Sequence, residues 1–332
     1  MNRFLGVDVG GTKAAAVLID EAGTTLASRW TEHEGQWHGR LVETVTASIE
    51  ALLAEAGVGV AGVDAIGVAV AGLVGRDRST LVHSPLIRET HLDLGTGLSE
   101  RLGRHVTVDN DANATLYGIA WHDRETGNAP PDPDRVWLLL TLGTGLGGAI
   151  MVGDEVLVGA HGFAAELGHV SVDYTDERTC ACGSRGCVEQ FASGRGLEEL
   201  ARLLPPPEVS VRTLEGLGLR GPVSARGIVA AAGADDPWAT GLLDNAGIML
   251  GRALSILCVT LDPAVVIVGG SLGHAAGRWL LPAARREMLA RWVYPAERPL
   301  PRLALDSIGP YAAASGAALL AAASRDKEQA NA

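Results

Sequence analysis

The sequence predicts an α/β fold made of two related halves, arranged as two domains. The chain has 332 residues, which exceeds what one hydrophobic core usually supports. Short apolar segments of strand type are followed by an amphipathic helical segment. A pattern of strand, glycine turn, strand and turn near residue 4 returns near residue 136, and such a weak internal repeat is expected of a duplicated fold.

The first half begins with three strands joined by turns, expected at residues 4–9, 13–19 and 25–30. A helix is predicted over 41–56, and Gly57 stands where a C-terminal cap belongs. Its apolar residues repeat at helical spacing. They are Leu41, Val42, Val45, Ile49, Leu52 and Leu53. A short buried strand follows at 65–70.

The second half repeats the strand pattern, with strands expected at 136–142 and 148–152 and a turn at Gly153 and Asp154. Proline and polar residues predict exposed loops at 126–135 and 204–208. The final helical segment, 311–323, is rich in alanine and apolar, so it must pack against another part of the chain.

Composition narrows the class of protein. The chain is 47% hydrophobic and 20% charged, as in a globular protein with a core. Its net charge of −12 disfavours nucleic acid as a partner. No run of about 18 apolar residues is present, and the first residues lack the apolar core of a signal peptide. We therefore expect no membrane association and a cytoplasmic location.

The segment DVGGTK is a candidate phosphate-binding turn. Without Cβ atoms, Gly10 and Gly11 let backbone N–H groups converge on phosphate oxygens. Thr12 adds a hydroxyl, Lys13 a cation, and Asp8 a carboxylate placed to hold Mg²⁺ through water. The order Thr-Lys and the strand that follows exclude a P-loop, which needs a helix there. An ordinary hairpin turn is the alternative explanation of this motif alone.

Two further glycine segments favour a nucleotide site. GTGLGG at 143–148 supplies Gly143, Thr144 and Gly145 in a second hairpin context. VVIVGGS at 265–271 is a strand that ends in Gly269 and Gly270, which leave room for an adenine base. Each segment is weak evidence, but together they favour ATP over chance turns.

The cysteine cluster CACGSRGC places Cys180, Cys182 and Cys187 within eight residues, and His169 lies eleven residues upstream. Three thiolates and one imidazole make a closed tetrahedral set typical of structural Zn²⁺. A redox cysteine pair and unligated thiols are the alternatives. Cys258 lies in an apolar helical run and is expected in the core.

The segment VDNDANA places Asn110 and Asp111 at the end of a probable strand. Phosphoryl transfer to a sugar hydroxyl needs a carboxylate to accept the hydroxyl proton, and Asp111 is the candidate base. Helix capping by these two residues is the alternative. Glu166 and Glu189 lie on either side of the zinc cluster in sequence and are candidates for hydrogen bonds to a hexose, with solvated salt bridges as the alternative.

These segments together resemble the bacterial ROK family of repressors and sugar kinases. The resemblance covers nearly the whole chain and consists of motifs that occur in the family's order. They are DVGGTK, DNDANA, GTGLGG, AAELGH, CACGSRGCVEQFASG and VIVGGS. The zinc segment with the Glu189 that follows it is the most specific of them.

The resemblance implies an actin-like (ribonuclease H-like) duplicated fold with ATP and Mg²⁺ in an interdomain cleft. It implies a smaller domain at 1–114, joined by a terminal helix at 311–332, and a larger domain at 115–310 with the zinc segment at 169–187. It implies a homodimer and Asp111 as the catalytic base. It also implies a sugar site made by Gly72, Asn110, Asp111, Glu166, His169 and Glu189, in which His169 serves both zinc and sugar.

Three functions remain open at this point: a sugar 6-kinase, a sugar-responsive transcriptional regulator and a non-catalytic sugar sensor. Only seven residues precede Asp8, too few for a DNA-binding domain, which favours the kinase. Glucose is the first expected substrate, and N-acetylmannosamine or another amino sugar is the second. The loop 83–92 lacks the Asn and Trp found in many family members, and Leu73 and Ile119 also depart from common residues, so sugar identity is left open.

Overall fold

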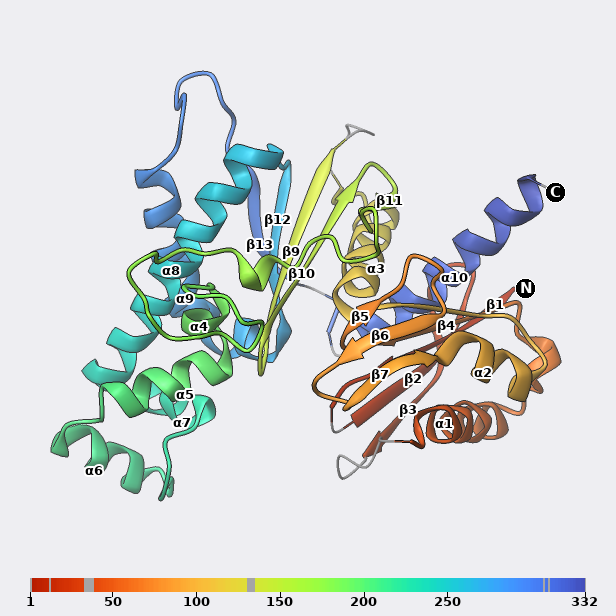
Figure 1. Cartoon of the computed structure of the whole chain (residues 1–332), viewed down its shortest axis with the longest axis horizontal. Helices are drawn as coiled ribbons and strands as arrows, with labels where there is room; N and C mark the ends of the chain where they lie inside the picture. Colours follow the sequence, from red (N-terminus) through yellow and green to blue (C-terminus); the bar gives the residue numbers. More distant parts are fainter. Residues whose placement is uncertain are drawn as a thin grey trace. The chain divides into compact units, whose positions relative to one another are not determined.

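The computed structural model describes residues 2–11, 13–32, 39–129, 135–306, 308–309 and 311–331 (Figure 1). The chain divides into two compact units. Unit 1 comprises Met1–Pro133, Ala149–Ala165 and Ser307–Ala332, and unit 2 comprises Asp134–Gly148 and Glu166–Asp306. This division keeps the segment 115–133 in unit 1, whereas the sequence analysis expected a boundary after residue 114. As a statement about domains, that boundary stays a prediction.

Unit 1 contains a five-stranded sheet with the order β3-β2-β1-β4-β8. Its strands are β1 Arg3–Val9, β2 Lys13–Asp20, β3 Thr25–Glu32, β4 Ala65–Val70 and β8 Val106–Asn110. The first three strands form an antiparallel meander, while β4 runs parallel to both β1 and β8. The remaining short strands form a separate three-stranded sheet. They are β5 Leu73–Val74, β6 Thr80–Ser84 and β7 Glu89–Asp93.

Helices cover both faces of the first sheet because successive side chains of a strand point to opposite faces. On one face, Leu5 and Val7 share a core with Val45 and other apolar residues of α1 Leu41–Ala56, joined by α2 Leu94–Leu102. On the other face, Phe4 packs in a core with α10 Ala312–Asn331 and with partly buried side chains of α3 Asp111–Glu125. The helices of unit 1 can be followed in Figure 1.

The alanine-rich helix α10 approaches the sheet so closely that glycine is required beneath it. A Cβ added to Gly6 would lie 1.8 Å from the carbonyl oxygen of Ala314, and one added to Gly67 would lie 2.0 Å from that of Ala317. Small residues on both sides therefore bring the helix backbone against the strands. This packing confirms the expectation that the apolar terminal helix needs a partner.

The second sheet has the order β11-β10-β9-β12-β13. Its strands are β9 Val136–Leu142, β10 Leu146–Val152, β11 Glu155–Val156, β12 Val265–Gly269 and β13 Arg302–Leu305. Numbered along the chain, both sheets have the order third, second, first, fourth, fifth. Strand β12 runs parallel to β9 and β13, as β4 runs parallel to β1 and β8. The shared topology confirms the duplication predicted from the repeated hairpins.

Unit 2 contains six α-helices in its described residues. They are α4 Glu189–Ala192, α5 Gly194–Leu203, α6 Glu208–Gly216, α7 Ala225–Gly233, α8 Pro237–Leu261 and α9 Gly270–Ala290. Short 3₁₀ turns occur at Val60–Gly62 in unit 1 and Leu167–His169 in unit 2. Helix α8 is long and apolar enough to cross a membrane, but 67% of its most apolar window is buried in the protein, as in a core helix. Cys258 is buried in this helix, as predicted.

Most predicted elements are confirmed to within two residues, including the helix at 41–56 with Gly57 in a left-handed conformation, φ 65°. The strand expected at 148–152 begins earlier, at Leu146, because the end of the glycine turn already pairs in the sheet. The terminal helix runs on to Asn331 instead of ending at 323. Part of the loop expected at 126–135 lies outside the described residues.

Candidate functional site

The predicted residues of unit 1 gather at the carboxyl edge of its sheet. In the register of the strands, Val70 is the partner of both Val9 and Asn110, so three parallel strands end at the same level. Asp8 precedes the end of β1, and Gly72 follows the end of β4. In open α/β sheets this edge is where ligands bind.

The turn after β1 is tight. The N–H of Gly10 donates to the carbonyl of Lys13 at 2.9 Å, and Lys13 opens β2 with an exposed side chain. Thr12, which we expected to offer a hydroxyl to phosphate, lies outside the described residues. The hydrogen bond between Gly10 and Lys13 identifies a hairpin turn. Its contact with phosphate stays a prediction.

Two carboxylates interact at this edge. Burial raises the pKa of Asp8 from its ordinary value of 3.8 to about 7, and the negative charge of Asp111 adds to the shift. Repulsion between two acidic groups is relieved when a cation or a shared proton lies beside them. The pair thus fits the predicted Mg²⁺ site by its chemistry.

Asn110 and Asp111 have different local roles. Asn110 is the N-cap of α3, and its Oδ1 accepts from the N–H of Ala112 at 2.8 Å and of Asn113 at 3.2 Å. Its Nδ2 donates to the carbonyl of Gly72 at 3.0 Å. Asp111 is the first residue of the helix, and its Oδ1 accepts from Ala112 at 2.9 Å. The capping alternative therefore holds for Asn110.

Gly72 occupies a position that favours glycine. Its φ is 153°, and an added Cβ would lie 2.6 Å from the carbonyl oxygen of His83. The buried Ser84 beside it anchors the loop 83–92, because its Oγ donates to the carbonyl of Ala71 at 2.5 Å. Two residues on, Leu86 is 41% exposed and would contact a Cβ added to Gly11 at 3.5 Å. An apolar side chain thus lies beside the glycine turn, which sequence motifs did not reveal.

The second glycine turn, in unit 2, is hydrogen-bonded to the start of α5. The N–H of Gly143 donates to the carbonyl of Gly145 at 2.9 Å, which closes the turn. Gly194 donates to the carbonyl of Gly143 at 2.8 Å, and Arg195 to that of Thr144 at 3.1 Å. The turn is therefore held by a helix more than 45 residues further along the chain.

A pocket of about 530 Å³ opens beside this turn, and its volume lies in the range of about 300–1,000 Å³ of small-molecule sites. It is lined by residues from the turn and from helices α5, α7 and α9. Its polar members are Thr144, Arg195, Glu198, Arg226 and Ser271. The sequence analysis missed Arg195, Glu198 and Arg226 because they belong to no motif and come together only through helix packing.

Gly269 and Gly270 do not line that pocket. Gly270 has a φ of 81°, and an added Cβ would lie 2.4 Å from the carbonyl oxygen of Leu142. A tight turn from β12 into α9 therefore accounts for a glycine at 270 without any ligand. Contact of the two glycines with adenine stays a prediction.

The structure brings the predicted zinc ligands together. One ligand atom each from His169, Cys180, Cys182 and Cys187 lie within 4.8 Å of one another. The Sγ atoms of Cys182 and Cys187 are 3.7 Å apart, and Cys180 Sγ is 3.7 Å from His169 Nδ1. Zn–S bonds of about 2.3 Å in a tetrahedron separate two sulfur atoms by roughly 3.8 Å. The four residues therefore fit a tetrahedral ion.

The cluster is folded by a short loop with turns at glycines. Gly183 N–H donates to the carbonyl of Cys180 at 2.9 Å, and both Gly183 and Gly186 have positive φ, 89° and 67°. The pKa of Cys187 is raised to about 12, by burial first and then by its contact with Cys182. A cation is what would stabilise a thiolate in such surroundings.

Glu189 connects the cysteine cluster with the glycine turn. Its Oε2 accepts from the N–H of Leu146 at 2.8 Å, and its Oε1 lies 3.9 Å from Cys180 Sγ. Glu166 Oε2 is 3.9 Å from His169 Nε2. Partial burial raises the pKa of Glu166, the charge of His169 opposes the shift and Glu189 reinforces it. Solvent screens this shift because 47% of the side chain is exposed.

The fold and this set of side chains define an α/β protein with duplicated halves, two glycine turns and a histidine–cysteine cluster. The ROK family model matches residues 4–324. A glucokinase of Streptomyces coelicolor is 34% identical over 325 residues, 97% of this chain and 98% of that protein. An N-acetylmannosamine kinase of Salmonella arizonae is 32% identical over 277 residues, 82% of this chain and 84% of that protein.

Among solved structures, a ROK family glucokinase from Streptomyces griseus in complex with glucose and AMPPNP has a TM-score of 0.80 and 31% identity, over 97% of this chain and 100% of that one. The chain belongs to the ROK family. The family recognised from the motifs is thereby confirmed, and so is the actin-like α/β fold class.

Proposed function

We propose that this chain is an ATP-dependent hexose kinase, with glucose phosphorylated at its 6-hydroxyl as the first expected reaction. The observation that carries the proposal is the interacting pair Asp8 and Asp111 at the edge of the sheet that also bears the Gly10–Gly11 turn. The glucokinases among the similar proteins support the same activity, since they match this chain over nearly its full length.

In the proposed reaction, Asp111 accepts the proton of the attacking sugar hydroxyl as the new O–P bond forms. The helix cap made by Asn110 supports this role, because it holds the first turn of α3, and with it Asp111, in place. Mg²⁺ near Asp8 would neutralise charge on the phosphates. The two glycine turns would offer backbone N–H groups to the phosphates, other than those of Gly10 and Gly143, which donate within the turns.

The pocket beside Gly143 and Thr144 is the proposed binding site of the nucleoside. Its size and its walls of helix side chains suit a purine nucleoside, with Arg195, Glu198 and Arg226 available for polar contacts. The position of the pocket beside the Gly143–Gly145 turn supports ATP as its ligand. The AMPPNP complex of the Streptomyces griseus glucokinase is a precedent for nucleotide binding in the family.

We also propose that His169, Cys180, Cys182 and Cys187 hold one structural Zn²⁺. Their mutual distances support a closed tetrahedral site without an open position for catalysis. With Nδ1 of His169 on the metal, Nε2 stays available on the side of Glu166. The sugar site proposed for unit 2 therefore consists of Glu166, His169 and Glu189, and that for unit 1 of Gly72, Asn110 and Asp111.

A second substrate class is an N-acylated amino sugar. The exposed Leu86 beside the glycine turn favours it, because an apolar side chain offers no hydrogen bond to a hydroxyl but gains contact with a methyl group. The similarity to an N-acetylmannosamine kinase agrees with this alternative.

The experiment that tests the proposed function is an ADP-release assay with ATP and Mg²⁺ over a panel of hexoses and N-acetylhexosamines. We expect sugar-dependent ADP release, highest for glucose or for one N-acylated sugar. Binding of a sugar without ADP release from any member of the panel would instead indicate a sugar sensor, and would reject the kinase.

A further inference from the structure

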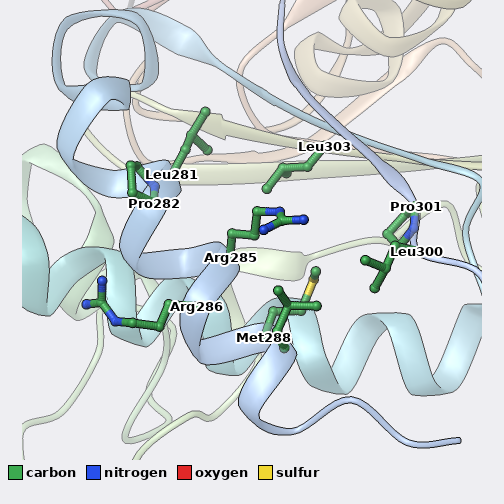
Figure 2. Close-up of a pocket in the computed structure, with 9 residues that line it drawn as sticks. Leu281, Pro282, Arg285, Arg286, Met288, Leu300, Pro301 and Leu303 are labelled. Atoms are coloured by element: carbon green, nitrogen blue, oxygen red, sulfur yellow. The ribbon is translucent and has the colours of Figure 1, made fainter. Parts of the chain in front are cut away.

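A groove in unit 2 lies apart from every residue of the predicted site. It runs between the second half of α9 and the segment that leads into β13, and it has a volume of about 710 Å³. Most of its wall is hydrocarbon, as Figure 2 shows. The apolar side chains that line it include Leu281, Met288, Leu289, Leu300, Pro301 and Leu303. A groove of this size can hold a small organic molecule.

Two arginines of α9, Arg285 and Arg286, line this apolar groove, and the side chain of Arg285 extends across it. Leu281, Arg285 and Leu289 are four residues apart on α9 and therefore share one face of the helix. Figure 2 shows Arg285 reaching across the middle of the groove toward Leu303 and Pro301. Across the part of the chain that the structure describes, its guanidinium has no hydrogen bond or ion pair. An anion would therefore meet an unpaired charge there.

The neighbouring Arg286 provides a comparison within the same helix. Its Nη2 donates to Asp244 Oδ1 at 3.0 Å, and in Figure 2 its side chain points away from the other labelled residues. Both arginines are exposed, but only Arg286 is paired with a carboxylate, while Arg285 lies beside the hydrocarbon wall. Arg285 is exposed to solvent, and a guanidinium without a carboxylate partner beside an apolar wall can pair with the carboxylate of an amphiphilic ligand.

We propose that this groove binds a small amphiphilic monocarboxylate, with the carboxylate on Arg285 and the hydrocarbon chain along the leucine-lined wall. A guanidinium offers two parallel N–H donors that match one carboxylate. The apolar wall matches a chain of several methylene groups, each of which favours burial. Inorganic phosphate is the poorer fit, because it needs several donors and gains nothing from hydrocarbon. The proposal is independent of the kinase activity.

The test is calorimetric titration of the full chain with octanoate below its micellar concentration. We expect one site per chain, binding about tenfold weaker in Arg285→Gln, and little change in the matched control Arg286→Gln. Arg285→Lys keeps the charge and should lose less than Arg285→Gln. Leu300→Ser, at an exposed position, should weaken binding about threefold or more by removing hydrocarbon. Circular dichroism of each variant verifies that it is folded.

Two further probes separate the contribution of the carboxylate from that of the hydrocarbon chain: octanamide has no charge, and acetate has no long chain. Octanamide should bind wild-type chain more weakly than octanoate and should not distinguish Arg285→Gln from wild type, and acetate should bind far more weakly than octanoate. Equal octanoate affinity for wild type and Arg285→Gln, an equal loss in Arg286→Gln, or acetate binding as tight as octanoate would each overturn the proposal. So would light scattering that shows Leu300→Ser converting a dimer to a monomer, because the groove would then belong to a contact between two copies.

Discussion

At the scale of single residues, the chemistry depends on the carboxylates at the edge of the first sheet. Asp8 and Asp111 come from different elements, and each raises the energy of charging the other. Asn110 holds the start of α3 and the carbonyl of Gly72 at the same time. Substitution of a single carboxylate at this edge should therefore change the activity while the protein stays folded.

Asp111→Asn tests the proposed base. The amide is nearly isosteric and can still accept at the helix start, but it cannot take the hydroxyl proton. We expect kcat to fall by at least about a hundredfold, the lower range for a general base, with sugar binding retained. Steady-state kinetics and sugar titration measure the two effects. The exposed Glu50→Gln on α1 serves as the control, and near-normal turnover of folded Asp111→Asn would remove Asp111 from this role.

The pKa of Asp8 predicts how stability depends on pH. Because this pKa is raised to about 7 in the folded protein, the folded chain keeps a proton between about pH 4 and pH 7 that the unfolded chain has released. Stability should therefore fall as the pH rises through this window and level off above it. At about 1.4 kcal/mol for each pKa unit, the contribution is about 4 kcal/mol at most.

Asp8→Asn isolates this effect. Without Mg²⁺ and nucleotide, the variant should be more stable than wild type at pH 8 and similar at pH 4, while its kinase activity is lost. Urea unfolding at the two pH values measures the difference in the free energy of unfolding. Identical pH dependence in both proteins would show that Asp8 is not the titrating group.

At the scale of elements, the packing of α10 depends on glycines. A Cβ added to Gly316 would lie 1.8 Å from the carbonyl oxygen of Ala114 in α3. The backbones of the two helices must separate to admit it, so Gly316→Ala should destabilise the protein by about 1–3 kcal/mol or more. The control is Gly241→Ala in α8, where nothing lies within 4 Å. There alanine should stabilise by about 0.5–1 kcal/mol through helix propensity.

Denaturant unfolding of these two glycine variants gives the comparison. The prediction requires opposite signs, because the two substitutions are chemically identical and differ only in the space around them. Stabilisation by Gly316→Ala would contradict the close contact of α3 and α10.

The segment 169–187 should depend on its metal as a unit. Metal analysis should give about one Zn²⁺ per chain, and Cys182→Ser should lose metal, thermal stability and sugar affinity together. The coupling follows from His169, whose ring would lose the ion that orients it next to Glu166. Cys258→Ala, at a buried position in α8, should retain the zinc. A metal-free preparation with full activity would reject the zinc proposal.

At the scale of the whole molecule, the residues proposed to bind sugar are distributed over both compact units. Gly72, Asn110 and Asp111 belong to unit 1, and Glu166, His169 and Glu189 to unit 2. We predict that sugar binding closes the chain into a more compact form and excludes water from the phosphoryl path. ATP hydrolysis without sugar should then be far slower than phosphorylation.

Small-angle scattering tests this closure. We expect a smaller radius of gyration when a true substrate is added, and the degree of compaction should rank hexoses in the order of their kcat/KM. A sugar that is phosphorylated efficiently without compaction, or ATP hydrolysis at a comparable rate in its absence, would show that domain closure does not control the chemistry.

The sequence by itself determined the duplicated α/β fold, most element boundaries, the family and the four members of the cysteine–histidine cluster. These depend on local signals, such as apolar periodicity, glycine turns and the short spacing of cysteines, that act within a few residues of the chain. The helix 41–56 with its cap at Gly57 and the burial of Cys258 followed from such signals and agree with the structure.

Only the tertiary structure decided which distant residues meet. Arg195, Glu198 and Arg226 join Thr144 through the packing of α5 and α7, and no periodicity in the sequence marks them. Gly270 proved to be required by the carbonyl of Leu142, and Leu86 proved to lie beside Gly11. Contacts of this kind depend on side chains far apart in sequence, whose positions follow from how helices and strands pack and not from local propensity.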